Sequence, residues 1–270
     1  MRLKKSRKPA LLNQTATRLL SAAALCVASP LGLASSDGWT WNLTPYLFAA
    51  DLGADIKIGE VSIDTDISFD ELLENLDSGA MGMLSARNDR WVIALDATYM
   101  KLSDKESSSV SGPFGRTTLD GAVESTSRLW IYQPMVGYLL IDDALKLDVY
   151  GSLRYTRLRS NLEVTITTSG AVFAGGERQA RADAEWTDLV VGTHFRLPLL
   201  ERWYFEGLAD IGTGNDSDLS YQVLAALQWQ FSDAMSVNVG YRYLYQDFEK
   251  DSFRWEATYS GLLAGLSFRF

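Results

Sequence analysis

The one histidine of the chain, His194, is the first candidate for a catalytic general base. Hydrolytic sites use a positioned base, most often histidine, together with a nucleophile or a second polar partner. Polar and apolar residues alternate around it, so a strand would place His194 on the same side as Asp188 and Arg196. Hydrogen bonding among these charged neighbours also explains a histidine there. We therefore expect His194 to be structural and the protein not to be an enzyme.

Two further motifs have the composition of a ligand site without its spacing. Asp64-Thr65-Asp66 looks like the start of a calcium loop, but Phe69 stands where that loop needs glycine and Asn75 where it needs the closing glutamate. The glycine-rich stretch 212–216 is not followed by the helix start that a phosphate site requires. The one cysteine, Cys26, lies near the N-terminus. We expect no metal site and no cofactor.

Charged residues recur at every second position of several segments, and strand alternation would turn them towards one interior. Both signs are mixed, and a charge held away from water must be paired or hydrated. We expect a salt-bridge network that fills the lumen of a barrel, with a selective water-lined path as the alternative. The residues of this predicted network are Arg87, Asp96, Lys146, Asp148, Arg154, Asp188, His194, Arg196, Glu206, Asp210 and Arg242.

The elements that must hold these residues are strands of period two. In the segment from Arg90 to Leu102 the positions Trp91, Ile93 and Leu95 alternate with smaller or polar residues. About ten such segments follow one another, joined alternately by tight turns and by longer links such as Ser103–Leu119, as in a bacterial outer-membrane barrel. The prediction is an all-β, antiparallel, up-and-down transmembrane barrel of about ten strands, with eight or twelve as alternatives. A soluble β-sandwich or lipocalin is the other fold considered.

A short amphipathic helix is predicted in the first long link. Ser68 and Glu71 form a capping box, which marks a helix start. Its apolar residues fall at helical spacing and form one stripe. The helix would either plug the mouth of the barrel or pack on a neighbouring loop. The residues of the stripe are Phe69, Leu72, Leu73 and Leu76.

The N-terminus has the composition of a cleaved signal peptide. Residues 1–18 carry six Lys and Arg and no acid, and an apolar run follows to Ala34. We expect residues 1–34 to be the signal peptide and residues 35–270 a single barrel domain. Loss of six cations would take the net charge from −9 to −15. Such an acidic chain is a poor partner for nucleic acid, and contact with anionic lipid head groups would need divalent cations or local basic patches.

The C-terminal strand alternates apolar residues and ends on an aromatic ring. Leu266, Phe268 and Phe270 share one parity. This ending resembles the C-terminal assembly signal of bacterial outer-membrane β-barrels. The stretch from Ser68 to Trp91 resembles uncharacterised proteobacterial barrel proteins, in which a short acidic helix precedes the second strand. The resemblance implies the outer membrane of a Gram-negative bacterium, with the barrel assembly machinery, outer-membrane lipid and lipopolysaccharide as partners.

For function, we expect a non-enzymatic barrel, either structural or a narrow, porin-like channel for small solutes. The first alternative is a surface-binding or adhesion barrel that acts through acidic outer loops. The less favoured alternative is a lipid-modifying outer-membrane enzyme. Proteases and phospholipases occur on such barrels, but His194 is expected near the tight turn at Pro198, inside the lumen, where neither type has its active site.

Overall fold

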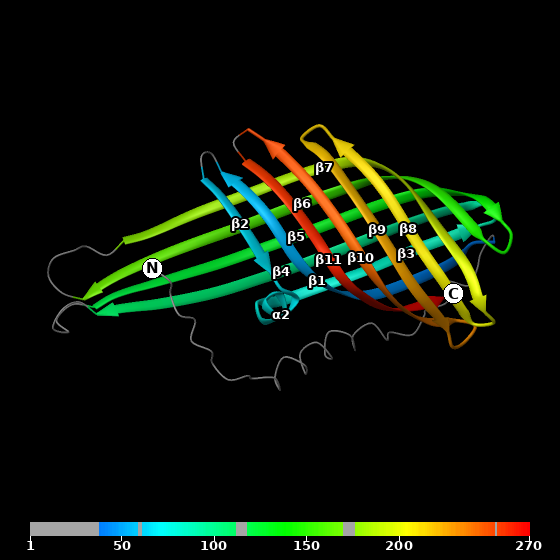
Figure 1. Ribbon diagram of the computed structural model, residues 1–270, viewed down its shortest axis with the longest axis horizontal. Coiled ribbons are helices and arrows are strands. Elements are labelled where there is room, and N and C mark those ends of the chain that lie inside the picture. Colours follow the sequence, from blue (N-terminus) through cyan, green and yellow to red (C-terminus); the bar gives the residue numbers. More distant parts are fainter. Residues whose placement is uncertain (1–37, 59–60, 112–117, 170–175, 252) are drawn as a thin grey trace. The chain divides into compact units, whose positions relative to one another are not determined.

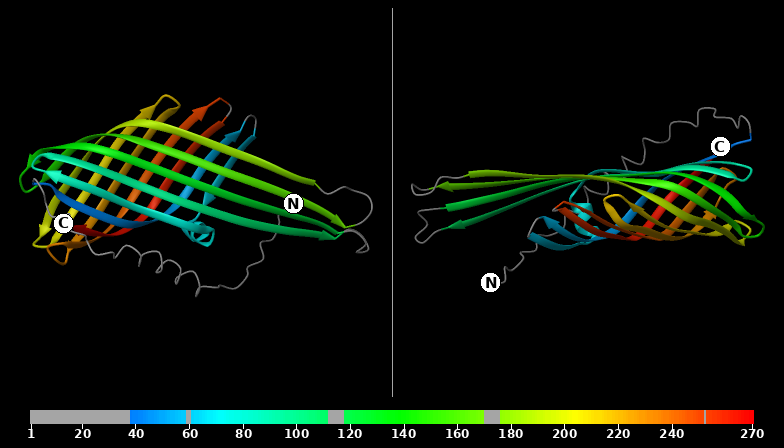
Figure 2. Two further views of the ribbon diagram at one scale, coloured as in Figure 1. Left: turned by 180° about the vertical axis from the view of Figure 1, so that it is seen from behind. Right: turned by 90° about the horizontal axis from the view of Figure 1, so that it is seen from above.

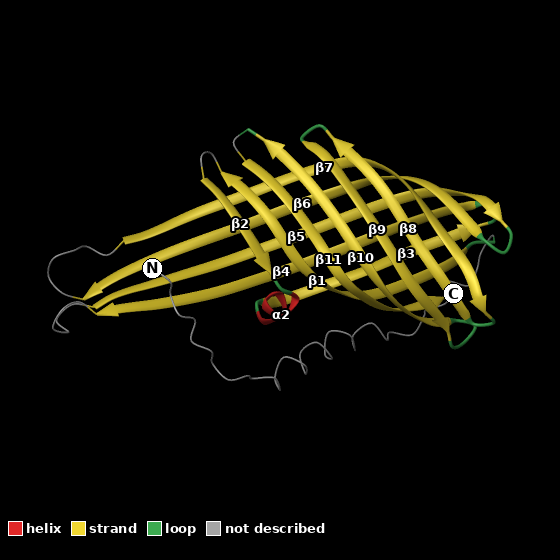
Figure 3. Cartoon of the chain, in the orientation of Figure 1, coloured by secondary structure: helices red, strands yellow, loops and turns green. Residues whose placement is uncertain are grey.

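The computed structural model describes residues 38–58, 61–111, 118–169, 176–251 and 253–270, which are almost entirely β-strand (Figures 1 and 3). The predicted signal peptide, residues 1–34, lies outside the described residues. No helix among the described residues is long and apolar enough to cross a membrane. The elements are β1 (Thr40–Ile58), β2 (Val61–Ile67), α2 (Phe69–Glu74), β3 (Leu76–Asn88), β4 (Trp91–Ser111), β5 (Thr118–Asp142), β6 (Lys146–Ser169), β7 (Gly176–Leu200), β8 (Trp203–Gly214), β9 (Ser217–Gln230), β10 (Met235–Lys250) and β11 (Phe253–Arg269).

Ten of these strands, β1 and β3 to β11, close into an antiparallel barrel, which confirms the predicted fold and strand number. Each strand pairs with the next along the chain, and β11 pairs with β1 to close the ring. Two backbone hydrogen bonds between Trp41 and Phe270, of 2.9 and 3.0 Å, hold the last residue to the first strand. The additional strand β2 pairs only with β1, from Leu52 to Ile58. Closure leaves the barrel strands without the open edges that a flat sheet would have.

The outward face of the barrel is apolar because every second side chain of each strand points away from the lumen. Leu47, Leu189 and Leu262 are each more than 60% exposed on this face. Aromatic rings lie at both limits of the apolar band: Trp91 packs on Tyr138 at 5.2 Å near the short turns, and Tyr99 packs on Trp130 at 5.6 Å towards the other end. Eight residues separate Trp91 from Tyr99, about 26 Å along the tilted strand. At a strand tilt of about 40° this length spans about 20 Å of height, so the two rows of rings lie close to the edges of the roughly 25 Å apolar band of an outer-membrane barrel.

Four strands continue beyond the barrel. Strand β3 pairs with β4 as far as Leu102, and β8 pairs with β7 as far as Asp188. Past these points β4, β5, β6 and β7 pair only with one another, up to Ser111 and Gly176 (Figure 2). We call this four-stranded sheet the outer extension, the end that carries it the extension end, and the opposite end the turn end.

The outer extension corrects the predicted loops. The predicted link 103–119 is mostly strand, because β4 runs to Ser111 and β5 begins at Thr118. These segments include Val and Thr, and such β-branched residues fit a pleated surface. Their low hydrophobicity had indicated loop.

The predicted helix is present as α2, but it ends at Glu74, so Leu76 of the predicted stripe is the first residue of β3 instead. Ser68 is its N-cap, and its Oγ accepts a hydrogen bond from the backbone N–H of Glu71 at 3.4 Å. The backbone N–H of Phe69 donates to Asp51 of β1 at 2.8 Å. No residue of the helix is buried. The role as a plug stays a prediction. Among the described residues, no hydrogen bond or ion pair joins a side chain of this helix to a residue of the lumen.

Candidate functional site

The interior of the barrel is crossed by a hydrogen-bonded network centred on the carboxylate of Asp210. One oxygen, Oδ1, accepts from Arg154 Nη2 at 2.7 Å. The other, Oδ2, accepts from Tyr150 Oη at 2.8 Å, Gln222 Nε2 at 2.7 Å and Gln133 Nε2 at 3.2 Å. These donors come from β5, β6 and β9, so one carboxylate of β8 ties four strands together. A carboxylate with this many donors is well compensated for its burial.

The ion pair at this centre is closed to water. The side chains of Arg154 and Asp210 are each 0% exposed. Arg154 uses its remaining donors on Gln133 Oε1, at 3.1 Å from Nε, and on Ser220 Oγ, at 3.2 Å from Nη1. Because every side of the guanidinium meets a protein acceptor, the pair is satisfied without solvent.

The network continues to the opposite wall through Arg242. Its Nε donates to Gln222 Oε1 at 3.0 Å, and its Nη1 reaches Tyr46 Oη at 3.2 Å and Asp96 Oδ2 at 3.3 Å. Tyr46 in turn donates to Asp96 at 2.6 Å. Two arginines and two aspartates balance in charge. We call this set the central network; it consists of Tyr46, Asp96, Gln133, Tyr150, Arg154, Asp210, Gln222 and Arg242.

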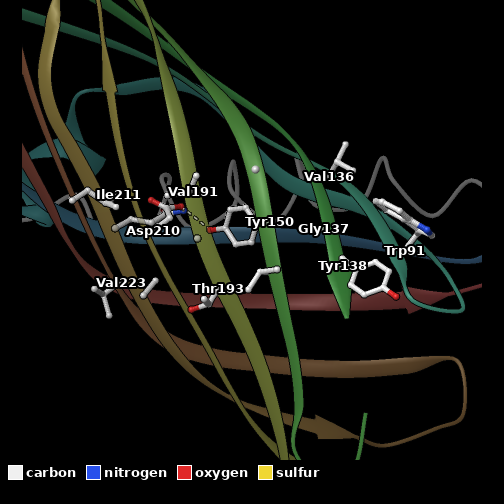
Figure 4. Close-up of a pocket in the computed structure, with 15 residues that line it drawn as sticks. Trp91, Val136, Gly137, Tyr138, Tyr150, Val191, Thr193, Asp210, Ile211 and Val223 are labelled. Atoms are coloured by element: carbon white, nitrogen blue, oxygen red, sulfur yellow. Dashed lines mark hydrogen bonds between the residues drawn. The ribbon is translucent and has the colours of Figure 1, made fainter. Parts of the chain in front are cut away.

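A glycine makes room for part of the central network. A Cβ added to Gly192 would lie 2.5 Å from Tyr150 Cζ and 2.6 Å from Asp210 Cβ. The missing side chain lets the Tyr150 ring reach across to Asp210. Figure 4 shows these two side chains pointing towards one another. They line a hollow of about 680 Å³, whose other lining includes Val136, Val191, Ile211 and Val223. The apolar lining belongs to the outward face, and Tyr150 and Asp210 close its inner side.

A second charged cluster lies towards the turn end. Arg87 binds Asp148 through two hydrogen bonds, of 2.7 and 3.0 Å, and His194 Nδ1 lies 3.2 Å from the same carboxylate. In the same cluster, Arg196 Nε lies 3.5 Å from Glu206 Oε1. Among the described residues, no hydroxyl or thiol hydrogen bonds to the His194 ring. The arrangement therefore orients the His194 ring on the Asp148 carboxylate.

Two predicted network residues are placed differently from the rest. Lys146 is half-exposed at the start of β6 and pairs with Asp142 in the turn, because its strand leaves the lumen at that point. Asp188 is fully buried beside Arg154 in the β6–β7 register, yet neither of its oxygens has a hydrogen-bond partner within the described structure. Strand parity predicts which side a residue takes, but not its depth or its neighbours.

Towards the extension end the lumen holds a cluster of apolar side chains beside the buried hydrogen bond from Gln246 Nε2 to Thr156 Oγ1, of 2.8 Å. The Trp186 ring stacks on Phe248 at a centroid distance of 4.5 Å, and Leu244, Trp255 and Tyr259 are buried with them. Trp255 lies on the inward face of β11 and is 6% exposed. The lumen of the described barrel therefore holds three layers: the cluster around Asp148, the central network and this apolar cluster.

The sequence reasoning missed the neutral members of the central network. Tyr46, Gln133, Tyr150 and Gln222 satisfy the charges, and all four have inward parity on their strands. The strand alternation indicates the inward side for all four, although none of them carries a charge. Of the predicted assembly residues, Leu266 faces outward and is 44% exposed, while Phe268 and Phe270 lie partly buried where β11 meets β1 and β10.

Comparisons with known proteins support the fold but do not assign the chain to a family. No protein-family model matches the chain, and no curated protein matches it in sequence. Among solved structures, the outer membrane protease OmpT from Escherichia coli superimposes with a TM-score of 0.50 at 9% identity, over 87% of this chain and 97% of that one. The translocator domain of the autotransporter NalP from Neisseria meningitidis gives a TM-score of 0.42 at 12% identity, over 95% and 96% of the two chains. At these identities the likeness to OmpT shows a shared fold alone: this chain has the fold of an outer-membrane β-barrel.

Proposed function

We propose that the protein is a non-enzymatic outer-membrane barrel with a filled lumen, which holds the outer extension at the cell surface. The central network carries this proposal, because it crosses the lumen from β5 and β6 to β1 and β4 and leaves the Arg154–Asp210 pair no access to water. A channel would need a continuous hydrated path, and the charges of the central network are paired with one another and leave no such path at their level. Of the two functions expected from the sequence, this arrangement favours the structural barrel over the narrow channel.

The location rests on two supports. The exposed apolar band between two rows of aromatic rings is what a barrel presents to lipid, and the ending Leu266, Phe268, Phe270 resembles the outer-membrane assembly signal. The turn end would face the periplasm, because bacterial barrels have short periplasmic turns and longer outer segments. The outer extension then projects from the cell.

The absence of enzymatic activity is part of the proposal. His194 is 33% exposed, lies in the turn-end cluster and is bonded to a carboxylate that Arg87 already binds. Protease and phospholipase assays on the wild type and on His194→Ala test this point. An activity that is present in the wild type and lost in the variant, with folding intact, would contradict it.

Cysteine labelling of whole cells tests the location and the orientation. The one natural cysteine, Cys26, lies in the predicted signal peptide, so single cysteines can be introduced at Asp104 in the outer extension and at Ala144 in a turn. Both positions are exposed. A membrane-impermeant maleimide should label Asp104→Cys on intact cells, and Ala144→Cys only after the outer membrane is permeabilised. The reverse pattern, or labelling of neither in a membrane fraction, would refute the proposal.

A further inference from the structure

Four arginines gather on the outward face at the base of the outer extension. Alternation continues past the apolar band, so the outward positions of β6 run from Leu153 and Tyr155 to Arg157 and Arg159. Neighbouring strands add Arg128 from β5 and Arg181 from β7 on the same face. We call Arg128, Arg157, Arg159 and Arg181 the arginine cluster. It is a local basic patch on a chain that is otherwise acidic.

The strand register places these side chains next to one another. Arg128 is directly opposite Arg159, and Asn161 is directly opposite Arg181. Together with Asp183 they line a cleft of about 300 Å³. Like charges directly opposite each other in a sheet are unfavourable. The pairing of Arg128 with Arg159 therefore points to a negative group outside the chain.

The carboxylates nearby neutralise only part of the cluster. Asp183 accepts from Arg157 at 3.1 Å and from Arg159 at 2.9 Å, and Glu185 lies 3.3 Å from Arg157. Hydrogen bonding from Arg157 lowers the pKa of Asp183 below its usual range, so this carboxylate stays charged. Arg128 and Arg181 have no hydrogen-bond or ion-pair partner among the described residues. Four guanidinium groups thus face two carboxylates, and two positive charges are left over.

The depth of the arginine cluster matches that of lipid phosphates. Trp130 and Tyr155 occupy the outward positions just before Arg128 and Arg157, and such amphipathic rings settle at the head-group level of a bilayer. Each next outward position lies about 7 Å further along the strand. Further out still, Glu124 lies between Lys105 and Glu163 in the strand register, so the excess of positive charge ends there. The excess therefore lies at the level where phosphates of the outer leaflet would lie.

We propose that the arginine cluster binds the phosphate groups of lipopolysaccharide in the outer leaflet. The inference rests on the proposed outer-membrane orientation. Arginine suits this role because its planar fork makes paired hydrogen bonds to phosphate and its charge does not titrate. Arg157 and Arg159, held by Asp183, form the fixed side of the site, and Arg128 and Arg181 close on the ligand.

Binding of purified lipopolysaccharide to the refolded, full-length mature protein tests the proposal. The variant Arg128→Gln with Arg181→Gln removes the two unpaired arginines and leaves no carboxylate without its partner. The control is Arg90→Gln with Lys250→Gln, which removes the same charge from an exposed turn at the turn end and from β10. We expect the affinity of the cluster variant to fall by about tenfold or more, since charge-assisted contacts are the strong ones. The control should bind like the wild type, and heat-dependent gel mobility shows whether each variant is folded.

Two measurements on the wild type need no mutation. Lipid A whose phosphates have been removed should bind much more weakly than lipopolysaccharide, and inorganic pyrophosphate should compete only at far higher concentration. Equal affinity of cluster variant and control, or equal binding of dephosphorylated lipid, would overturn the proposal. Pyrophosphate that binds as tightly as lipopolysaccharide would also overturn it in favour of a free-phosphate site. A protein that fails the cysteine-labelling test contradicts the orientation instead, so the two failures are distinguishable.

Discussion

Replacing Arg154 by alanine is the most informative perturbation of the lumen. The substitution removes three hydrogen bonds, to Gln133, Ser220 and Asp210, from a side chain that has no exposed surface. Asp210 keeps its neutral donors but loses its ion-pair partner. Breaking a buried pair from one side costs about 3–5 kcal/mol, and the lower figure applies if water fills the space. We therefore expect the free energy of unfolding to fall by about 3 kcal/mol or more.

The measurement is equilibrium unfolding by denaturant in detergent micelles or lipid vesicles, followed by tryptophan fluorescence. Asp210→Ala should cost a similar amount, and the double variant should cost clearly less than the sum, because the second change removes a charge already left unpaired. Lys146→Ala, at an exposed pair in a turn, is the matched control and should unfold like the wild type. Unchanged unfolding in Arg154→Ala, or strictly additive effects in the double variant, would refute the central network as a stabilising unit.

Three further predictions follow from individual contacts. Asp188→Asn should raise the free energy of unfolding or leave it unchanged, since it removes a buried charge without hydrogen-bond partners, and a clear loss of stability would mean that the carboxylate has a partner. Gly192→Ala should destabilise by about 1–3 kcal/mol, because its methyl group would overlap the Tyr150 ring; wild-type stability in the same unfolding assay would contradict the close approach. Deleting Phe270 should lower the amount of protein in the outer membrane, measured in cell fractions, while the same variant still refolds in detergent; normal cellular levels would argue against an assembly signal.

Much of the fold could be predicted from the sequence because strand alternation is a local property. The outward Trp91, Ile93 and Leu95, and the inward Asp96, follow from the period of two alone. The helix at Phe69–Glu74 follows from the Ser68 cap and the spacing of its apolar residues. Strand length was predicted less well, because the polar strand segments of the outer extension lack the apolar face that identifies the other strands.

For the residues of the site, the sequence predicts which face of a strand each occupies but not which residues it contacts. Arg87 and Asp148 are 61 residues apart in sequence, and their contact depends on strand stagger, which alternation does not reveal. Alternation also does not reveal how far along the barrel axis a residue lies. Lys146 and Asp188 were therefore predicted to belong to a network to which neither is hydrogen-bonded. The neutral side chains of Gln133, Tyr150 and Gln222 decide whether the charges are satisfied, and neutral polar residues carry a weaker sequence signal than charged ones.

The conductance of the refolded wild-type protein in a planar bilayer tests the central claim, a lumen sealed by its own side chains. Insertion is checked first by the heat-dependent gel mobility of the folded barrel. With the Arg154–Asp210 pair closed to water on all sides, the account predicts a bilayer that stays at its baseline current over a wide range of voltage. Regular, reproducible current steps from folded wild-type protein would show an open path through the lumen and contradict the account.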